Sequence, residues 1–136
     1  MSPYKVGIVG FGWVAGAHLK SYADLGQFEP VAVMSRRELD PEMFRSEYGV
    51  DVKVYNDYDK FLAEGDMDIV DICTPHPFHS EQAIKAAQAG KNLVIEKPIS
   101  LDFESAVAML EAVEKAGVRT SVCFEARFIS VARSMK

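Results

Sequence analysis

The sequence is poor in cysteine and lacks long hydrophobic runs. It has two cysteines, Cys73 and Cys123, in 136 residues, and their positions exclude a C-x-x-C motif. A disulfide framework is therefore excluded, and we expect both thiols to be reduced core residues of a cytoplasmic protein. No apolar run approaches the ~18 residues of a membrane-spanning helix, and the run at residues 6–9 is too short for the core of a signal peptide. We therefore expect no membrane partner.

Positive charge and histidine are also scarce. The chain has 15 lysines and arginines against 20 acidic residues, a formal net charge of −5, and three histidines. This balance argues against a nucleic acid or an anionic membrane as partner, so an anionic ligand would need a local group of basic residues. The cysteines have no ligand partners nearby in the sequence, and we predict no metal site. The apolar content of 49% is typical of a globular domain that buries a core of its own.

A glycine-rich turn lies between the first apolar run and a helical pattern. Gly10, Gly12 and Ala15 fit the spacing G-x-G-x-x-G/A of dinucleotide-binding folds. There the first glycine permits a tight turn, the second lets the backbone approach a pyrophosphate, and the third small residue lets the helix pack closely on the strand. The helix N-terminus offers N–H groups and the positive end of its dipole to the phosphates. We therefore predict a dinucleotide site whose turn comprises Gly10, Phe11, Gly12, Trp13 and Val14.

Strands and helices are expected to alternate along the chain. The expected strands cover residues 5–9, 30–34, 52–55, 69–73, 92–95 and 118–123, and the expected helices cover residues 14–25, 41–48, 57–63, 80–89 and 102–116. Near-continuous apolar strands of this kind are typical of a parallel sheet that is covered on both faces. The sequence thus predicts an α/β fold with a doubly wound parallel sheet of the Rossmann type, in three αβα layers.

Apolar residues at helical spacing mark two segments near the C-terminal end. The stripe expected on the helix at residues 102–116 comprises Phe103, Val107, Leu110 and Val113. A further set predicts the start of another helix over residues 124–136 and comprises Phe124, Phe128, Val131 and Met135.

Two arginines follow the second expected strand, in the run Ser35, Arg36 and Arg37. In an NAD-binding unit an acidic residue at this place accepts from the ribose 2′-hydroxyl, whereas a 2′-phosphate is bound by arginine. The nearest acid here is Glu38, so the pattern favours NADP as cofactor, with NAD as the alternative. A charged hydrogen bond of about 1.5–3 kcal/mol would discriminate roughly 10- to 150-fold. Two solvated loop arginines would give the same pattern without any cofactor role.

Two proline-containing loops follow later strands. The loop at residues 74–79 has two prolines, and the turn of Glu96, Lys97 and Pro98 follows the strand at residues 92–95. Ligands bind outside the carboxyl ends of the strands in open α/β sheets. Both loops are therefore expected at the same edge as the glycine turn.

Together these motifs resemble the N-terminal domain of the Gfo/Idh/MocA oxidoreductases, over essentially the whole chain. The motifs that carry the resemblance are the glycine turn, the Thr74-Pro75-x-x-x-His79 loop, the Gly90-Lys91-Asn92 turn and the Glu96-Lys97-Pro98 turn. The resemblance implies hydride transfer between a nicotinamide cofactor and a sugar, cyclitol or related hydroxyl or carbonyl substrate. It implies that Lys97 is the catalytic proton donor or relay, and that Glu96 orients Lys97 or helps to hold the nicotinamide ribose.

The resemblance also assigns roles in the loop at residues 74–79. Thr74, Pro75 and His76 would line the nicotinamide end of the cofactor, and His79 would brace the loop. For both histidines, packing or capping within the loop is the alternative interpretation. The remaining histidine, His18, lies on the first helix and is expected to be structural or exposed.

The sequence departs from the family pattern in one respect. Family members carry a second domain that supplies an Asp-x-x-x-His pair, yet no histidine follows Lys97 in this chain. We therefore expect residues 1–123 to form the NAD(P)-binding domain and residues 124–136 to begin the connection to a missing C-terminal substrate domain. The chain alone is expected to be inactive, and the full-length protein to form a homo-oligomer.

Other interpretations of the chain stay open at this point. Residues 124–136 could instead form a helix that docks back on the sheet. The chain could also be a non-catalytic dinucleotide-binding sensor or partner module, although such a module does not need a lysine at the position of Lys97. A methyltransferase that uses S-adenosylmethionine would want an acid where Ser35, Arg36 and Arg37 stand.

Overall fold

The computed structural model describes residues 2–128 and 134. In this part of the chain a single parallel sheet contains the strands β1 (Tyr4–Val9), β2 (Phe28–Met34), β3 (Lys53–Tyr55), β4 (Ile69–Ile72), β5 (Asn92–Glu96) and β6 (Thr120–Cys123). The strands are arranged in the order β3-β2-β1-β4-β5-β6. The order reverses beside β1, which is the topological switch point of the doubly wound fold. The predicted fold class is confirmed.

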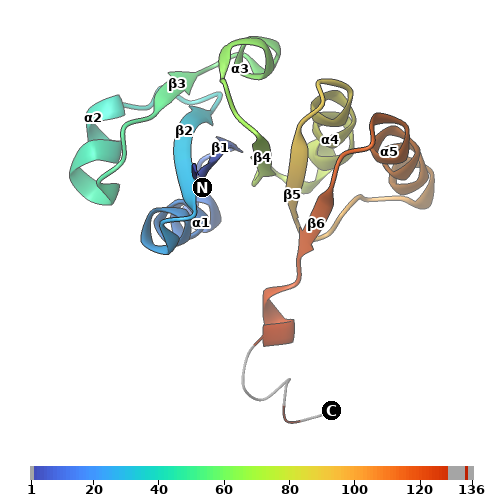
Figure 1. The fold of residues 1–136 in the computed structure, drawn as a ribbon. Coiled ribbons are helices and arrows are strands. Elements are labelled where there is room, and N and C mark those ends of the chain that lie inside the picture. The colour runs from blue at the N-terminus through green and yellow to red at the C-terminus, as the bar shows by residue number, and fades with distance from the viewer. Residues whose placement is uncertain (1, 129–133, 135–136) are drawn as a thin grey trace.

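Helices connect successive strands (Figure 1). They are α1 (Trp13–Leu25), α2 (Pro41–Met43), α3 (Tyr58–Glu64), α4 (His79–Gln88) and α5 (Phe103–Ala116). The helix expected over residues 41–48 is divided, because a π-helical turn at Phe44–Tyr48 follows α2. Short 3₁₀ turns lie at His76–Phe78 and Glu125–Phe128.

Two apolar layers lie on opposite faces of the sheet. Side chains alternate along β1, so Val6 and Ile8 pack in one cluster with Leu19 of α1 and Phe44. Val9 belongs to the other cluster, which contains buried side chains of α3, α4 and α5. The sheet is therefore the middle of three layers, as expected.

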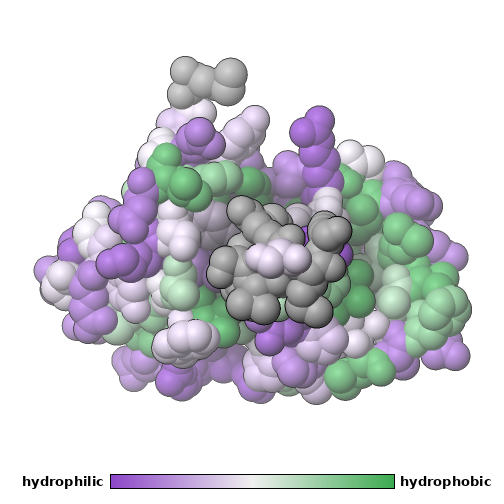
Figure 2. All heavy atoms as spheres, turned by 90° about the horizontal axis from the view of Figure 1, so that it is seen from below, coloured by the Kyte–Doolittle hydropathy of each residue, from purple (hydrophilic) through white to green (hydrophobic). Residues whose placement is uncertain are grey.

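The apolar stripe expected on α5 is only partly buried. Met109 is 2% exposed, whereas Leu110 and Phe103 are 54% and 79% exposed. The four residues of the stripe line one surface groove, and α5 packs on α4 so that Met109 turns inward while Leu110 and Phe103 stay at the surface. Hydrophobic side chains consequently gather at the surface where α5 lies, on the right-hand side of Figure 2.

The segment after β6 leads away from the sheet (Figure 1). Its described part forms a 3₁₀ turn at Glu125–Phe128, where an α-helix was expected. The rest of the expected helix, at residues 129–136, lies almost wholly outside the described residues. Among the helices that the structure describes, none is both long and apolar enough to cross a membrane.

Candidate functional site

The carboxyl ends of β1, β2 and β4 open onto a cleft of about 490 Å³. Eight of the predicted cofactor residues line it, namely Gly10, Phe11, Gly12, Ser35, Arg36, Arg37, Thr74 and Pro75. The fold thus brings the glycine turn, the arginine pair and the loop after β4 into one concave site. The other predicted residues lie outside its lining and are Trp13, Val14, His76, His79, Glu96 and Lys97.

Glycine is needed at the two glycine positions of the turn for different structural reasons. Gly10 has a φ of +82°, and a Cβ there would lie 2.9 Å from backbone atoms of Thr74. Only glycine tolerates this conformation at such a close approach. Gly12 has an extended backbone with a φ of −134°, and a Cβ there would meet nothing within 4 Å. The fold therefore requires Gly10, whereas Gly12 keeps open the space in front of α1.

The N-terminus of α1 is available to an anion. Gly12 is its N-cap and supplies no side-chain hydrogen bond, and its first turn contains no acidic residue. The first N–H groups of a helix lack partners within the helix and carry the positive end of its dipole. Trp13 begins the helix and is 88% exposed, so it flanks the cleft without closing it.

The arginine pair forms a positively charged wall of the cleft. Ser35 is buried, and its Oγ accepts a hydrogen bond of 3.1 Å from the backbone N–H of Arg37. The Arg37 guanidinium donates to the carbonyl oxygen of Phe11. The Arg36 guanidinium lies over the ring of Phe78, 5.0 Å from its centroid, in a cation–π contact. Arg37 is thus held beside the glycine turn and Arg36 beside the loop after β4, in a chain whose net charge is −5.

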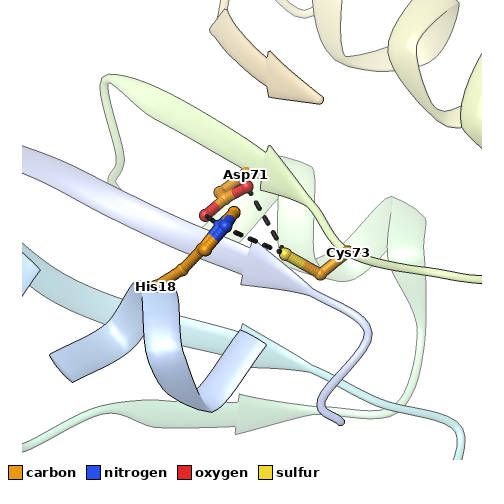
Figure 3. Close-up of side chains that lie close together, drawn as sticks. All are labelled: His18, Asp71 and Cys73. Carbon is orange, nitrogen blue, oxygen red and sulfur yellow. Dashed lines mark hydrogen bonds and ion pairs between the residues drawn. The ribbon is translucent and has the colours of Figure 1, made fainter. Parts of the chain in front are cut away.

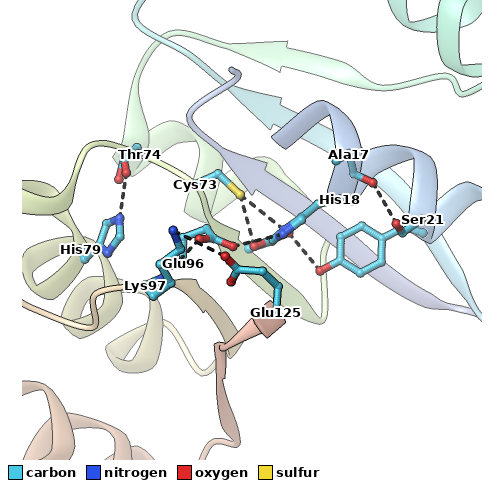
Figure 4. A network of polar contacts seen from close by, with 11 residues as sticks. Ala17, His18, Ser21, Cys73, Thr74, His79, Glu96, Lys97 and Glu125 are labelled. Carbon is cyan, nitrogen blue, oxygen red and sulfur yellow. Dashed lines mark hydrogen bonds and ion pairs between the residues drawn. The ribbon is translucent and has the colours of Figure 1, made fainter. Parts of the chain in front are cut away.

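His79 connects the loop after β4 to the turn after β5. It is fully buried, and its Nε2 lies 2.7 Å from the carbonyl oxygen of Thr74 (Figure 4). Its Nδ1 lies 2.8 Å from the carbonyl oxygen of Pro98. The ring therefore ties the two loops together, and its role in a cofactor site stays a prediction. His76 is exposed, and neither ring lines the cleft.

Glu96 and Lys97 lie at the end of β5 (Figure 4). Lys97 is exposed, and its Nζ lies 3.5 Å from a carboxylate oxygen of Glu125. Glu96 is largely buried, and it accepts a hydrogen bond of 3.2 Å from the backbone N–H of Lys97. Its other carboxylate oxygen lies 3.3 Å from Nε2 of His18. An ammonium group and a carboxylate thus flank the cleft at the carboxyl edge of the sheet.

A polar cluster around His18 is the part of the site that sequence reasoning missed. His18 Nδ1 lies 2.8 Å from a carboxylate oxygen of Asp71, and the Tyr22 hydroxyl donates to the same oxygen. The thiol of Cys73 also contacts Asp71 (Figure 3). One signal was present in the sequence: Asp71 is a charged residue within an apolar strand, and a buried carboxylate needs partners.

The charges in this cluster shift several pKa values. Hydrogen bonding to Asp71 raises the pKa of His18 above its ordinary value, Glu96 contributes in the same direction, and burial opposes both. Burial raises the pKa of the Cys73 thiol, and the charge of Asp71 adds to this. Burial and the same charges raise the pKa of Cys123 to about 12. The surroundings of His18 therefore favour the charged imidazole over the neutral one, and both thiols are protonated at neutral pH.

The same cluster contains residue types that can bind metals. Two sets of three side chains each have their potential ligand atoms within 4.8 Å of one another. The first set is His18, Asp71 and Cys73, and the second set is His18, Glu96 and Cys123. Hydrogen bonds already join these atoms, and a protonated thiol must lose its proton before it can bind a metal. The side chains of this cluster therefore have hydrogen-bond partners among the described residues without a metal ion. The absence of a metal site stays a prediction.

Comparison with known proteins decides the family. Residues 4–124 match the model of the Gfo/Idh/MocA oxidoreductases, described as an oxidoreductase family with an NAD-binding Rossmann fold. The chain belongs to this family. The match covers the glycine turn, the arginine pair and both proline-containing loops, and it confirms the resemblance inferred from the sequence motifs.

Its relatives include sugar and cyclitol dehydrogenases. The chain is 32% identical to levoglucosan dehydrogenase of Pseudarthrobacter phenanthrenivorans, and the alignment covers 93% of this chain and 34% of that protein. It is also 32% identical to inositol 2-dehydrogenase of Rhizobium meliloti, over 91% of this chain and 37% of that protein. A structure of scyllo-inositol dehydrogenase from Lactobacillus casei with NAD(H) and scyllo-inositol matches with a TM-score of 0.88 and 29% identity, over 98% of this chain and 40% of that one. The chain thus spans only about a third to two fifths of these relatives.

Proposed function

We propose that the chain is the cofactor-binding part of an NADP-dependent oxidoreductase that acts on a hydroxyl or carbonyl group of a sugar or cyclitol. The cleft carries this proposal, because it combines an open glycine turn with two arginines. Family membership and the named dehydrogenases among the relatives support the same class of reaction. Residues 1–123 would form the cofactor domain, and residues 124–136 would begin the connection to a substrate domain that also mediates homo-oligomer formation.

The residues of the cleft fit a dinucleotide. The open space at Gly12 and the uncapped start of α1 suit a pyrophosphate. The wall formed by Arg36 and Arg37 suits the 2′-phosphate of NADP, because guanidinium groups pair with phosphate through charge-assisted hydrogen bonds. Thr74 and Pro75 would lie beside the nicotinamide, with His76 at the rim. When bound, the nicotinamide supplies one carbon that accepts or donates a hydride.

The preference for NADP over NAD rests on the end of β2. The three positions directly after β2 hold Ser35, Arg36 and Arg37 and no acidic residue, so no carboxylate at these positions repels a 2′-phosphate. The contacts of the arginines with Phe78 and the Phe11 carbonyl hold both side chains near the cleft and reduce the entropy lost on binding. We therefore propose NADP as the cofactor, although the Lactobacillus casei relative was solved with NAD(H).

Lys97 is the proposed catalytic residue. In the direction of reduction, its ammonium group would donate a proton to the carbonyl oxygen of the substrate while a hydride reaches the carbonyl carbon. In the direction of oxidation, the neutral amine of Lys97 would accept the proton of the hydroxyl group, and the nicotinamide ring would supply the acceptor for the hydride. Glu96 lies next to Lys97 and would hold the nicotinamide ribose or orient the lysine.

Calorimetric titration with NADPH and NADH tests the cofactor proposal. We expect roughly 10- to 150-fold tighter binding of NADPH by the wild-type chain, as one charged hydrogen bond predicts. The double variant Arg36→Ala/Arg37→Ala should bind both cofactors equally. Arg119→Ala is the matched control, because it removes one exposed guanidinium before β6, at the opposite edge of the sheet.

Two results would contradict the proposal. Equal binding of NADH and NADPH by the wild type would refute the assignment of NADP, and binding of neither would refute the dinucleotide site. In the full gene product, Lys97→Met should abolish turnover and retain NADPH binding. A non-catalytic sensor would show no turnover that depends on Lys97.

A further inference from the structure

His18 lies between two carboxylates that belong to different strands. Its Nδ1 lies 2.8 Å from Asp71 at the end of β4, and its Nε2 lies 3.3 Å from Glu96 at the end of β5. The ring projects from α1, directly after the glycine turn in sequence. One imidazole thus connects the helix whose N-terminus faces the cleft with the strand that ends at Glu96, directly before Lys97 (Figure 4).

Asp71 fixes the orientation of this ring. Its side chain is fully buried, and it accepts hydrogen bonds from Tyr22 at 3.0 Å and from the thiol of Cys73 at 3.5 Å in addition to its contact with His18. A buried carboxylate is costly unless it is paired and hydrogen-bonded. The Nδ1 edge of the imidazole is therefore held at Asp71, and the Nε2 edge faces Glu96.

Glu96 contacts side chains of two other elements, His18 of α1 and the hydrogen-bonded Cys123 thiol of β6. One oxygen contacts His18, and the other accepts from the backbone N–H of Lys97 at 3.2 Å. The side chain of Glu96 is 12% exposed, so part of the carboxylate still faces solvent at the edge of the site. The direction in which this carboxylate points therefore depends on side chains of other elements, and of these His18 is itself held by the buried Asp71.

We propose that His18 is a positioning residue, through which Asp71 holds the Glu96 carboxylate correctly oriented for the bound cofactor and for Lys97. This inference rests on the proposed function, in which Glu96 meets the nicotinamide ribose. His18 itself touches neither the cleft nor Lys97, and it acts through Glu96. A purely structural role, in which His18 only ties α1 to Asp71, is the competing explanation.

The bridge depends on the charge of the imidazole. Only the protonated ring can donate from both nitrogens at once, since the neutral ring has one donor. Five titratable groups face His18: Asp71 from β4, Cys73 directly after β4, Tyr22 from α1 itself, Glu96 from β5 and Cys123 from β6. As the pH rises through the pKa of His18, the contact with Glu96 weakens while Asp71 keeps its donor.

Two isosteric variants separate the two explanations. Asparagine places its amide near the position of Nδ1, and glutamine places its amide near the position of Nε2. His18→Asn therefore keeps the donor to Asp71 and loses the donor to Glu96, and His18→Gln does the reverse. Lys20→Gln is the control, because it removes an exposed positive charge from the same helix.

The readout is the affinity for NADPH as a function of pH, with the imidazole of His18 titrated by NMR in the same samples. We expect His18→Asn to weaken binding about tenfold below the pKa of His18, as loss of one charged hydrogen bond predicts. His18→Gln should stay within about threefold of the wild type and lose the step in affinity at that pKa. Comparison at each pH with Lys20→Gln removes the contribution of the cofactor's own titration.

The outcomes distinguish this inference from the proposed function. Equal effects of both His18 variants, or a wild-type affinity with no step at the pKa of His18, overturn the positioning role. Glu96→Gln should lower the pKa of His18 even without cofactor, and an unchanged pKa overturns the bridge itself. Failure of the wild type to bind either dinucleotide overturns the proposed function, and with it the role of the bridge in binding.

Discussion

Replacing Gly12 by alanine should abolish tight dinucleotide binding and leave the fold intact, whereas the same change at Gly10 should destabilise the fold. The two residues belong to one turn, so the pair forms a matched experiment. A Cβ at Gly10 would lie 2.9 Å from the Thr74 backbone at a φ of +82°, whereas a Cβ at Gly12 would meet nothing within 4 Å. The comparison therefore distinguishes a glycine that the fold requires, Gly10, from a glycine that ligand binding requires, Gly12.

The expected magnitudes follow from these surroundings. At Gly10, the left-handed conformation costs about 1–2 kcal/mol for alanine, and displacing the Thr74 backbone costs about 1–3 kcal/mol more. The sum is a large part of a typical total stability of about 5–15 kcal/mol. At Gly12, alanine gains about 0.4–1 kcal/mol from the unfolded chain and loses a similar amount as a poorer N-cap. The net change at Gly12 should therefore be near zero.

Urea unfolding followed by circular dichroism measures the stability, and calorimetric titration with NADPH measures the affinity. We expect Gly12→Ala to unfold at nearly the wild-type midpoint and to bind NADPH at least about tenfold more weakly, which corresponds to ~1.4 kcal/mol. A loss of stability at Gly12 like that at Gly10 would refute the assignment of this glycine to the ligand. Wild-type affinity in a folded Gly12→Ala chain would refute the position of the pyrophosphate.

Two further predictions concern stability. Met109 is buried, so Met109→Ala should leave a cavity and lower the free energy of unfolding by about 2–4 kcal/mol. Leu110 is largely exposed, so Leu110→Ala should change the free energy of unfolding by less than about 1 kcal/mol. Similar losses for the two variants in denaturant titrations would argue against this orientation of α5. Because the folded pKa of His18 is raised, its stabilisation is fully present below its unfolded value of about 6.5 and is lost as the pH rises through the folded value. The difference in unfolding free energy between wild type and His18→Gln should therefore shrink as the pH rises above about 6.5, and a difference that grows with pH would contradict the charged bridge.

Much of the architecture follows from local sequence patterns. Alternating apolar strands and helices predict a parallel sheet, and Asp40, Asp57 and Asp102 each accept a backbone N–H at the start of the helix that they precede. The glycine turn and the arginine pair were also recognisable, because a phosphate site needs an open backbone and positive charge at strand ends. These signals depend on residues that are close in sequence, and the structure brings both motifs to one cleft.

Tertiary packing decided the rest. The spacing of apolar residues on α5 does not tell which of them faces the sheet, and the contact with α4 buries Met109 and leaves Leu110 exposed. The bridge of Asp71, His18 and Glu96 joins three elements that are far apart in the chain. No local pattern specifies such a bridge, because its energy depends on burial and on distances that exist only after the sheet has formed. The sequence by itself therefore determined the fold and the cofactor motifs, and the tertiary structure decided which side chains support them.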